Sequence, residues 1–132
     1  MRWTKNKLLV VVDTENNMDT VEAARYTAWE STRDRASWTY EEFCKATQGW
    51  VVHPVRGGAV LARESELHAC VFPNSMSRKV LKILDKTLKE HGEVVTSTFV
   101  GNSIGESFVS KLGFKRTNVI NNVQYWRLTN GT

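Results

Sequence analysis

The segment N-S-I-G-E-S-F-V-S-K-L-G-F runs from Asn102 to Phe114 and follows a run rich in valine and threonine, Val94–Val100. Runs of β-branched residues are typical of strands. Within the segment, three apolar residues recur at helical spacing: Phe108, Val109 and Leu112. They predict a helix that begins at Asn102 or Ser103 and ends at Gly113. The region therefore predicts a strand, a turn and a helix in direct succession.

The turn, Gly101–Gly105, also matches the G-x-S-x-G pattern of serine hydrolases, with Ser103 in the place of the nucleophile. In that fold the acid and then the histidine follow the serine in the chain. Here all three histidines precede Ser103, and no aspartate follows Asp85. We therefore exclude a serine hydrolase. The glycines instead indicate a turn that lets the backbone approach a ligand or a neighbouring strand.

Three β-rich runs lie upstream of this region: Trp50–Val55, Ala59–Arg63 and Glu66–Phe72. Arg56-Gly57-Gly58 separates the first two runs and is typical of a hairpin turn whose glycines adopt positive φ. Pro73 ends the third run, because proline cannot donate to a strand ladder. The runs predict a three-stranded antiparallel meander.

A long helix is predicted after the meander, ending at about His91 and closed by Gly92. Ser75 and Ser77 compete as its N-cap. Its apolar stripe consists of Val80, Leu81, Leu84 and Leu88. Another face is lined by Arg78, Lys82, Lys86 and Lys89, which is most often a solvated face of an amphipathic helix.

The N-terminal part supplies three more elements. Lys7–Asp13 predicts the first strand, and the apolar spacing from Asp19 to about Thr32 predicts a helix. Thr39 with Glu42 three residues later forms a capping box that opens a second, short helix.

The C-terminal part predicts a hairpin, because Phe114–Ile120 and Val123–Leu128 flank the turn-forming pair Asn121-Asn122. The predicted element order is β α α β β β α β α β β. It defines an α/β (α+β) protein with a mixed, mostly antiparallel sheet and helices on both faces.

The composition fits one globular domain spanning residues 1–132. The chain has 132 residues, 41% of them hydrophobic and 24% charged, which excludes a disordered chain and a coiled coil. The longest aliphatic run, Leu8–Val12, is far below the ~20 apolar residues that span a bilayer. We expect no membrane association and a cytoplasmic location.

The net charge and the cysteines indicate which ligands and metals the chain could bind. Eighteen lysines and arginines against 14 aspartates and glutamates give a net charge of +4, which suits a phosphate-bearing ligand or a nucleic acid. Cys44 and Cys70 are expected to be two reduced cysteines. His68 and Cys70 share one strand face, but two ligands do not make a zinc site, so we expect no metal.

In a wider window, the segment Asn102–Phe114 resembles the N-x-x-A-x-x-F-Y-x-K-L-G-F segment of the GNAT superfamily of N-acetyltransferases. The matching residues are Asn102, Phe108, Lys111, Leu112, Gly113 and Phe114, while Gly105 replaces the small residue. The motif occupies 13 residues, and the predicted element order is similar to that of the superfamily over nearly the whole chain. The chain also resembles small GNAT-like proteins of short-tailed phages, some carried in the virion, which similarly lack parts of the usual family motifs. That likeness implies a host cytoplasm or a virion as the location.

The resemblance implies a seven-stranded sheet with about four helices, splayed between its fourth and fifth strands, Glu66–Phe72 and Val94–Val100. Acetyl-CoA, a cosubstrate in this family, would lie in the splay. Its pantetheine would bond the backbone of the fourth strand, and its pyrophosphate would sit on the N-terminus of the next helix, where unpaired N–H groups favour phosphate. The implied cofactor-binding residues are Cys70, Val71, Phe72, Ser75, Met76, Ser77, Arg78, Lys79 and Asn102.

The chain departs from the family pattern at two places. The family's pyrophosphate loop is usually Q/R-x-x-G-x-G/A, whereas residues 74–79 read N-S-M-S-R-K and contain no glycine. Val109 stands where the family commonly has a tyrosine that protonates the leaving thiolate. The resemblance therefore leaves that role to Ser110, to Ser107 or to water.

The general base is expected on the fourth strand, where Glu66 and His68 alternate onto one face. In the family this strand often carries the base, and a histidine titrates near neutrality. The alternative interpretation is that both are partly exposed structural residues. Trp29, Trp38 and Tyr40 fall in the helical segment that shapes the acceptor site in this family, although aromatic residues there more often form core.

Two functions are therefore expected. In the first, the chain transfers an acetyl group from acetyl-CoA to an unidentified amine by direct attack, without a metal. In the second, it is a non-catalytic GNAT-fold protein of a phage, either a virion component or a binder of a host protein or nucleic acid. The basic helix over residues 78–89 would then make the contact.

Overall fold

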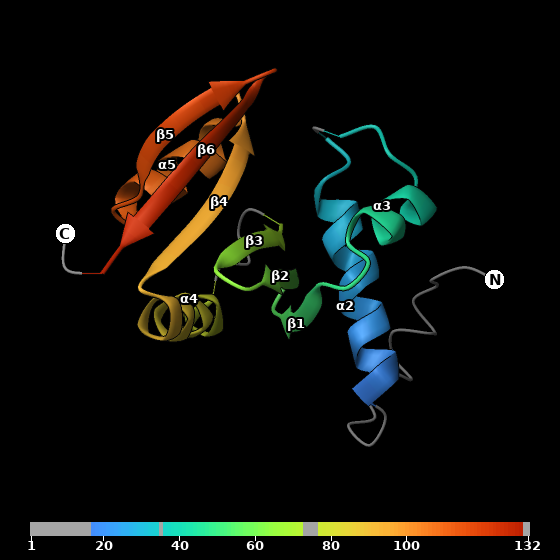
Figure 1. The fold of residues 1–132 in the computed structure, drawn as a ribbon. Coiled ribbons are helices and arrows are strands. Elements are labelled where there is room, and N and C mark those ends of the chain that lie inside the picture. Colours follow the sequence, from blue (N-terminus) through green and yellow to red (C-terminus); the bar gives the residue numbers. More distant parts are fainter. Residues whose placement is uncertain (1–16, 35, 73–76, 131–132) are drawn as a thin grey trace. The chain divides into compact units, whose positions relative to one another are not determined.

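The computed structural model of the chain describes residues 17–34, 36–72 and 77–130 (Figure 1). The described residues form α2 (Asn17–Ser31), α3 (Tyr40–Ala46), β1 (Val51–Val55), β2 (Gly58–Arg63), β3 (Glu66–Val71), α4 (Arg78–His91), β4 (Glu93–Phe99), α5 (Ser103–Lys111), β5 (Lys115–Ile120) and β6 (Val123–Thr129). The first strand expected at residues 7–13 lies outside the described residues. None of the described helices has the length and apolar character needed to cross a bilayer.

The fold is α+β, with a mostly antiparallel sheet. The described strands lie in the order β1-β2-β3-β4-β6-β5. β4 and β6 are antiparallel, as are β5 and β6, whereas β3 and β4 are parallel. A parallel pair needs a crossover connection, and α4 is that connection. The predicted order of elements is therefore confirmed from α2 to β6. Six strands are described, in place of the seven expected over the whole chain.

The chain divides into two compact units. Unit 1 comprises residues 1–61 and 69–77, and unit 2 comprises residues 62–68 and 78–132. β2 and β3 contribute residues to both units.

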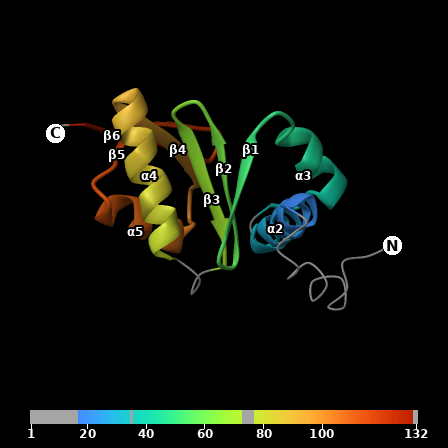
Figure 2. The same ribbon diagram turned by 90° about the horizontal axis from the view of Figure 1, so that it is seen from below.

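The core of unit 1 is built by α2 and α3, which lie side by side in Figure 2, together with β1 and β2. It buries the side chains of Ala24, Ala28, Phe43, Ala59 and Leu61. α3 begins where the sequence predicts, because Thr39 and Glu42 form the complete capping box. The Thr39 N–H donates to Glu42 Oε1 at 2.8 Å, and the Glu42 N–H donates to Thr39 Oγ1 at 3.1 Å.

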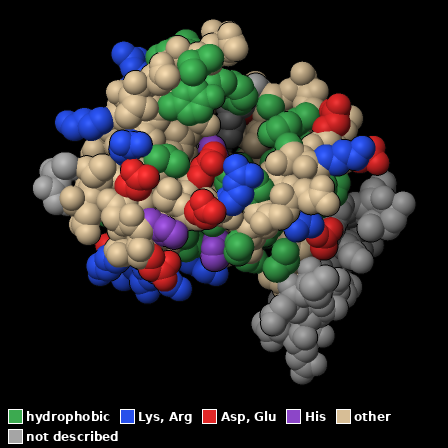
Figure 3. Space-filling model, in the orientation of Figure 1, with side chains coloured by type: hydrophobic (Ala, Val, Ile, Leu, Met, Phe, Trp, Pro, Cys, Tyr) green, Lys and Arg blue, Asp and Glu red, His purple; other side chains and the backbone are tan. Residues whose placement is uncertain are grey.

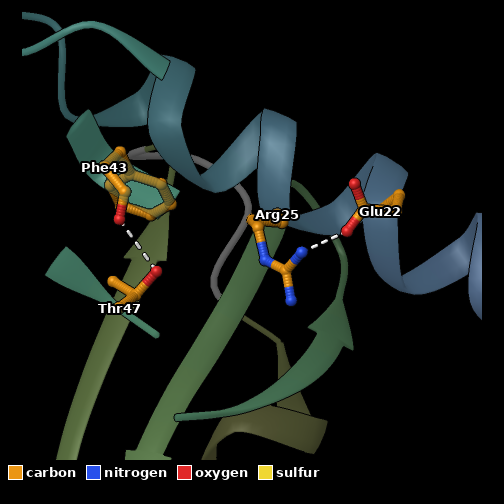
Figure 4. Close-up of polar contacts among 4 residues, drawn as sticks. All are labelled: Glu22, Arg25, Phe43 and Thr47. Atoms are coloured by element: carbon orange, nitrogen blue, oxygen red, sulfur yellow. Dashed lines mark hydrogen bonds and ion pairs between the residues drawn. The ribbon is translucent and has the colours of Figure 1, made fainter. Parts of the chain in front are cut away.

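Two further contacts reinforce these helices (Figure 4). On α2, Glu22 and Arg25 form an ion pair one turn apart. At the end of α3, the Thr47 hydroxyl donates to the carbonyl of Phe43 at 2.9 Å. Both contacts join residues three or four positions apart, so they stabilise helical turns locally.

An aromatic cluster packs against the core of unit 1. Tyr26, Trp29 and Tyr40 lie with ring centroids 5.1–5.6 Å apart, in tilted and edge-to-face arrangements. The Trp29 Nε1–H donates to the carbonyl of Trp38 at 3.0 Å, and Trp38 packs edge-on against Phe43. Burial raises the pKa of the Tyr40 hydroxyl. These contacts identify Trp29, Trp38 and Tyr40 as packing residues of this unit.

In unit 2, β4, β6 and β5 lie side by side, and α5 covers one face of them (Figure 1). Asn121 and Asn122 both adopt positive φ, 51° and 67°, as the tight hairpin turn requires. β5 is exposed along its whole length. Phe114 was expected to be its first residue, but the strand begins one residue later, and Phe114 is buried.

α4 packs against β4 within the same unit (Figure 2). Its buried residues are Val80 and Thr87. Leu81 was expected in the apolar stripe but is 43% exposed, because it lies at the flank of the buried face. Thr87 takes a buried place because its hydroxyl donates to the carbonyl of Ile83 at 2.9 Å.

A buried glutamine joins α5 to the sheet. Gln124 on β6 is 4% exposed, and its Nε2 donates to Glu106 Oε2 of α5 at 2.7 Å. Its Oε1 accepts from Arg116 Nη1 of β5 at 3.0 Å. Thr98 of β4 accepts from the indole N–H of Trp126 at 2.9 Å. Three strands and one helix therefore share one polar network in a low-dielectric setting, where each bond counts for more.

Replacing Gln124 by alanine is expected to lower the free energy of unfolding by about 2–3 kcal/mol, since Glu106 and Arg116 both lose a buried partner. Chemical denaturation followed by circular dichroism measures it. The matched control is Gln48→Ala, because Gln48 is exposed, and it should change stability by less than about 0.5 kcal/mol. Equal effects of the two variants would contradict a network role for Gln124.

Candidate active site

Glu66 and His68 on β3 form the clearest pair of chemically active side chains. They are two residues apart on a strand, so both project from the same face. His68 Nε2 lies 2.8 Å from Glu66 Oε2, and both side chains are partly exposed, at 25% and 34%. The pair therefore combines a short polar contact with access from solvent.

Arg63 at the end of β2 is the third member of this cluster. Its Nη2 lies 3.6 Å from Glu66 Oε1. A tight turn brings the two together, and Glu64 in that turn adopts a positive φ of 55°. Because all three residues belong to unit 2, their geometry is fixed within one compact body.

The surroundings keep the Glu66 carboxyl ionised. The hydrogen bond with His68 is the largest influence and lowers its pKa below the ordinary glutamate value. Partial burial opposes this, and the charges of His68 and Arg63 add to the lowering. A lasting carboxylate beside an imidazole orients the ring and stabilises the positive charge that the ring gains when it accepts a proton. The arrangement is that of a general base with an orienting partner.

The Glu66 pKa gives a direct test of this geometry. His68→Ala is expected to raise the pKa of the Glu66 carboxyl, because the variant removes the largest lowering influence. Arg63→Ala should raise it less. A ¹³C NMR titration of the glutamate carboxyls measures both shifts. An unchanged Glu66 pKa in His68→Ala would show that the pair is not formed in solution.

The same shift fixes the sign of a pH effect on stability. A carboxyl whose pKa is lowered on folding stabilises the folded state above its unfolded pKa. That contribution is lost as the pH falls through the lower, folded-state value. The Glu66–His68 contact therefore weakens in acid, below the ordinary range of glutamate titration.

The backbone of β3 carries the amides expected to bind pantetheine. The Phe72 N–H donates to the carbonyl of Gly57 at 3.1 Å, so this amide is engaged by the β1–β2 hairpin. Strand amides alternate between the two edges. The Val71 N–H therefore points to the opposite edge of β3, and the Cys70 N–H to the same edge as that of Phe72. Of the three expected donors, Val71 is the one directed away from the hairpin.

The start of α4 carries the expected phosphate-binding residues. Arg78 and Lys79 are exposed in its first turn. Ser77 was a candidate N-cap, but its Oγ is buried without a hydrogen-bond partner among the described residues. The other candidate, Ser75, and its neighbour Met76 lie outside the described residues.

Asn102 caps the start of α5, whose first residue is Ser103, and these are the two positions that the sequence offers for the start. Asn102 Oδ1 accepts from the N–H of Gly105 at 3.1 Å and is therefore the N-cap. A Cβ on Gly105 would lie 2.6 Å from Asn102 Nδ2, so a larger residue at this position would displace the side chain that caps the helix. The Gly101 N–H donates to Glu106 Oε2 at 3.0 Å and fixes the preceding turn. The Asn102 side chain, which was expected to contact the cofactor, is therefore engaged in capping α5.

The end of α5 carries the expected proton donor. Val109 is 6% exposed and packs inward, whereas Ser110 and Ser107 are exposed on the helix surface. Among the described residues no hydrogen bond joins Ser110 to Glu66 or His68. The structure therefore brings the two proposed base residues into contact with each other.

Sequence reasoning missed Arg63 and Glu106. Arg63 lies three residues before Glu66, and the strand–turn–strand pattern between them was the available signal. Glu106 contacts β6 across 18 positions of sequence, and no local pattern reports such a contact. In the described part of the chain, no group of three or more metal-binding side chains gathers.

Comparison of the chain with protein-family models, curated proteins and solved structures gives no match.

Proposed function

We propose that the chain is a GNAT-type N-acetyltransferase that moves an acetyl group from acetyl-CoA to an amine. The observation that carries the proposal is the 2.8 Å contact between His68 and Glu66 on a partly exposed strand face. The crossover from β3 through α4 to the parallel strand β4 agrees with the element order of that superfamily. The similarity of the segment Asn102–Phe114 to the N-x-x-A-x-x-F-Y-x-K-L-G-F segment of that superfamily also supports the proposal.

The proposed roles fall on residues of unit 2. His68 accepts the proton that the ammonium form of the acceptor must lose before its nitrogen can attack. Glu66, held ionised, orients the imidazole and balances its positive charge. Acetyl-CoA, when bound, supplies the thioester carbonyl. The new N–C bond forms as the C–S bond breaks; the attacking nitrogen then loses its extra proton, and the leaving sulfur gains one through Ser110 or water, so that an amide and the CoA thiol are formed.

Donors suited to the phosphates of the cosubstrate are present at the start of α4. Arg78 and Lys79 offer charged donors, and the first turn of a 14-residue helix offers unpaired N–H groups with the positive end of its dipole. Binding there would depend on charge and on side chains, because residues 74–79 contain no glycine that would admit a close backbone approach.

The test is acetyl transfer to a panel of amines: a polyamine, free lysine and a peptide with an unblocked N-terminus. Chromatography follows released CoA, and mass spectrometry identifies the acetylated acceptor. The proposal expects release above the protein-free rate with at least one acceptor class. Release that never exceeds the protein-free rate with any amine, at saturating acetyl-CoA, would contradict catalysis and favour the non-catalytic alternative.

A further inference from the structure

Helix α4 carries a large share of the lysines and arginines of the chain. It holds five of the 18 lysines and arginines and two of the 14 acidic residues, within 14 residues. The excess of three cations on this helix compares with a net charge of +4 for the whole chain. Of the described helices and strands, α4 therefore carries the most lysines and arginines.

The cations occupy one side of α4. A helical turn has 3.6 residues, so Arg78, Lys82, Lys86 and Lys89 fall within a narrow sector, with Lys79 at its margin. All five are exposed, and the opposite side buries Val80 and Thr87 against β4. In Figure 3, lysine and arginine side chains gather at the lower left, where Figure 1 places α4. We call these five cations the basic face.

Within the described part of the chain, carboxylates neutralise little of this charge. Lys89 forms an exposed ion pair with Asp85 at 3.0 Å. Among the described residues, none of the other four cations lies within ion-pairing distance of a carboxylate. The cations repeat about 6 Å apart along the axis and together extend about 16 Å, at 1.5 Å of rise per residue. The basic face is thus a straight, regularly spaced row of accessible donors.

We propose that the basic face binds the phosphate backbone of a nucleic-acid duplex. A duplex carries a charge about every 1.7 Å of its axis, so a row of this length faces several phosphates at once. Lysines predominate, which suits point contacts with phosphates and not the reading of bases. An anionic bilayer fits less well, since the apolar side of α4 is already packed against β4 and, of the large apolar residues of α4 itself, Leu81 alone is exposed.

The experiment titrates the full chain against fluorescent DNA and RNA duplexes of mixed sequence and follows anisotropy over a range of salt. Binding through four phosphate contacts predicts a slope of log K against log salt near −3.6, and an affinity loss of roughly 100-fold between about 50 and 200 mM salt. Binding of either duplex meets the expectation, because the shared backbone is the ligand. No binding of either at the lowest salt overturns the proposal.

Matched charge variants locate the contact. Lys82→Gln/Lys86→Gln should reduce the magnitude of the slope by about 2 and weaken binding at least tenfold, because two phosphate contacts are lost. Lys111→Gln/Lys115→Gln removes the same charge from other exposed positions of unit 2 and should leave the slope unchanged. Equal losses in the two variants would show that net charge, and not this face, binds the duplex.

A gain of binding provides a second test. Asp85→Asn releases Lys89 from its ion pair and should tighten duplex binding and steepen the salt slope by about 1. An unchanged slope would contradict the assignment of Lys89. Preference for phosphatidylserine vesicles over both duplexes would also overturn the proposal. Because Lys82 and Lys86 have no role in the proposed acetyl transfer, these variants test the basic face independently of catalysis.

Discussion

Gly58→Ala is expected to lower the free energy of unfolding by about 3 kcal/mol or more. The added Cβ would lie 2.1 Å from the carbonyl oxygen of Cys70 and 3.0 Å from the Cα of Val71. Both are backbone atoms of β3, so neither moves without displacing the strand. The substitution therefore opens the contact between β2 and β3.

The control separates crowding from backbone strain. Gly49→Ala places its Cβ in open space at a φ of +87°, so it carries only the cost of a left-handed conformation, about 1–2 kcal/mol. Urea denaturation of both variants measures the difference. If Gly58→Ala loses no more stability than Gly49→Ala, the close approach of β2 to β3 is not present in solution.

His68→Ala is expected to lower acetyl-transfer turnover by roughly 100-fold or more, since general-base catalysis contributes about 10²–10⁴. Its effect on acetyl-CoA affinity should be small, because the proposed phosphate donors lie at the start of α4. Glu66→Gln should lower turnover less, because the imidazole remains and loses only its orienting carboxylate. Steady-state rates with the best acceptor, together with the binding constant, measure the split.

The control is His91→Ala, a substitution of the same type at an exposed position in the last turn of α4. It should leave turnover within about twofold of the unsubstituted chain, as surface changes away from a site do. Equal losses in His68→Ala and His91→Ala would remove the assignment of the base. Recovery of the rate at higher pH in His68→Ala would support it, because more acceptor amine is then already neutral.

Local patterns predicted most of the fold. β-Branched runs located the described strands within one or two residues, and the capping box of Thr39 and Glu42 located the start of α3. The hairpin turn at Asn121-Asn122 followed from the tolerance of asparagine for positive φ. These features depend on short-range chemistry, which a sequence displays directly.

Features that depend on neighbours were harder to predict. Leu81 is exposed because the side of α4 that packs against β4 is centred on Val80 and Thr87. Thr87 can be buried because its hydroxyl forms a hydrogen bond with the helix backbone. Gln124 can be buried because Glu106 of α5 and Arg116 of β5 form hydrogen bonds with its side chain. Such burial is set by tertiary contacts, and no spacing rule anticipates it.

The candidate site divides in the same way. The alternation of a strand predicted that Glu66 and His68 share a face, and they are in contact at 2.8 Å. The pattern did not predict Arg63, whose approach depends on the conformation of a turn. Nor did it predict that the Phe72 N–H donates to the carbonyl of Gly57, since that hydrogen bond depends on how the β1–β2 hairpin packs beside β3.

Calorimetric titration of the purified chain with acetyl-CoA, and separately with CoA, shows whether the chain binds the proposed cosubstrate. We expect micromolar binding that weakens at least tenfold in Arg78→Glu/Lys79→Glu, because two charged phosphate contacts are reversed. The charge-matched Lys45→Glu/Lys115→Glu, at two exposed positions, should bind as the unsubstituted chain does. The absence of binding at millimolar acetyl-CoA would contradict the proposed acetyltransferase and leave a scaffold whose function is the contact made by the basic face.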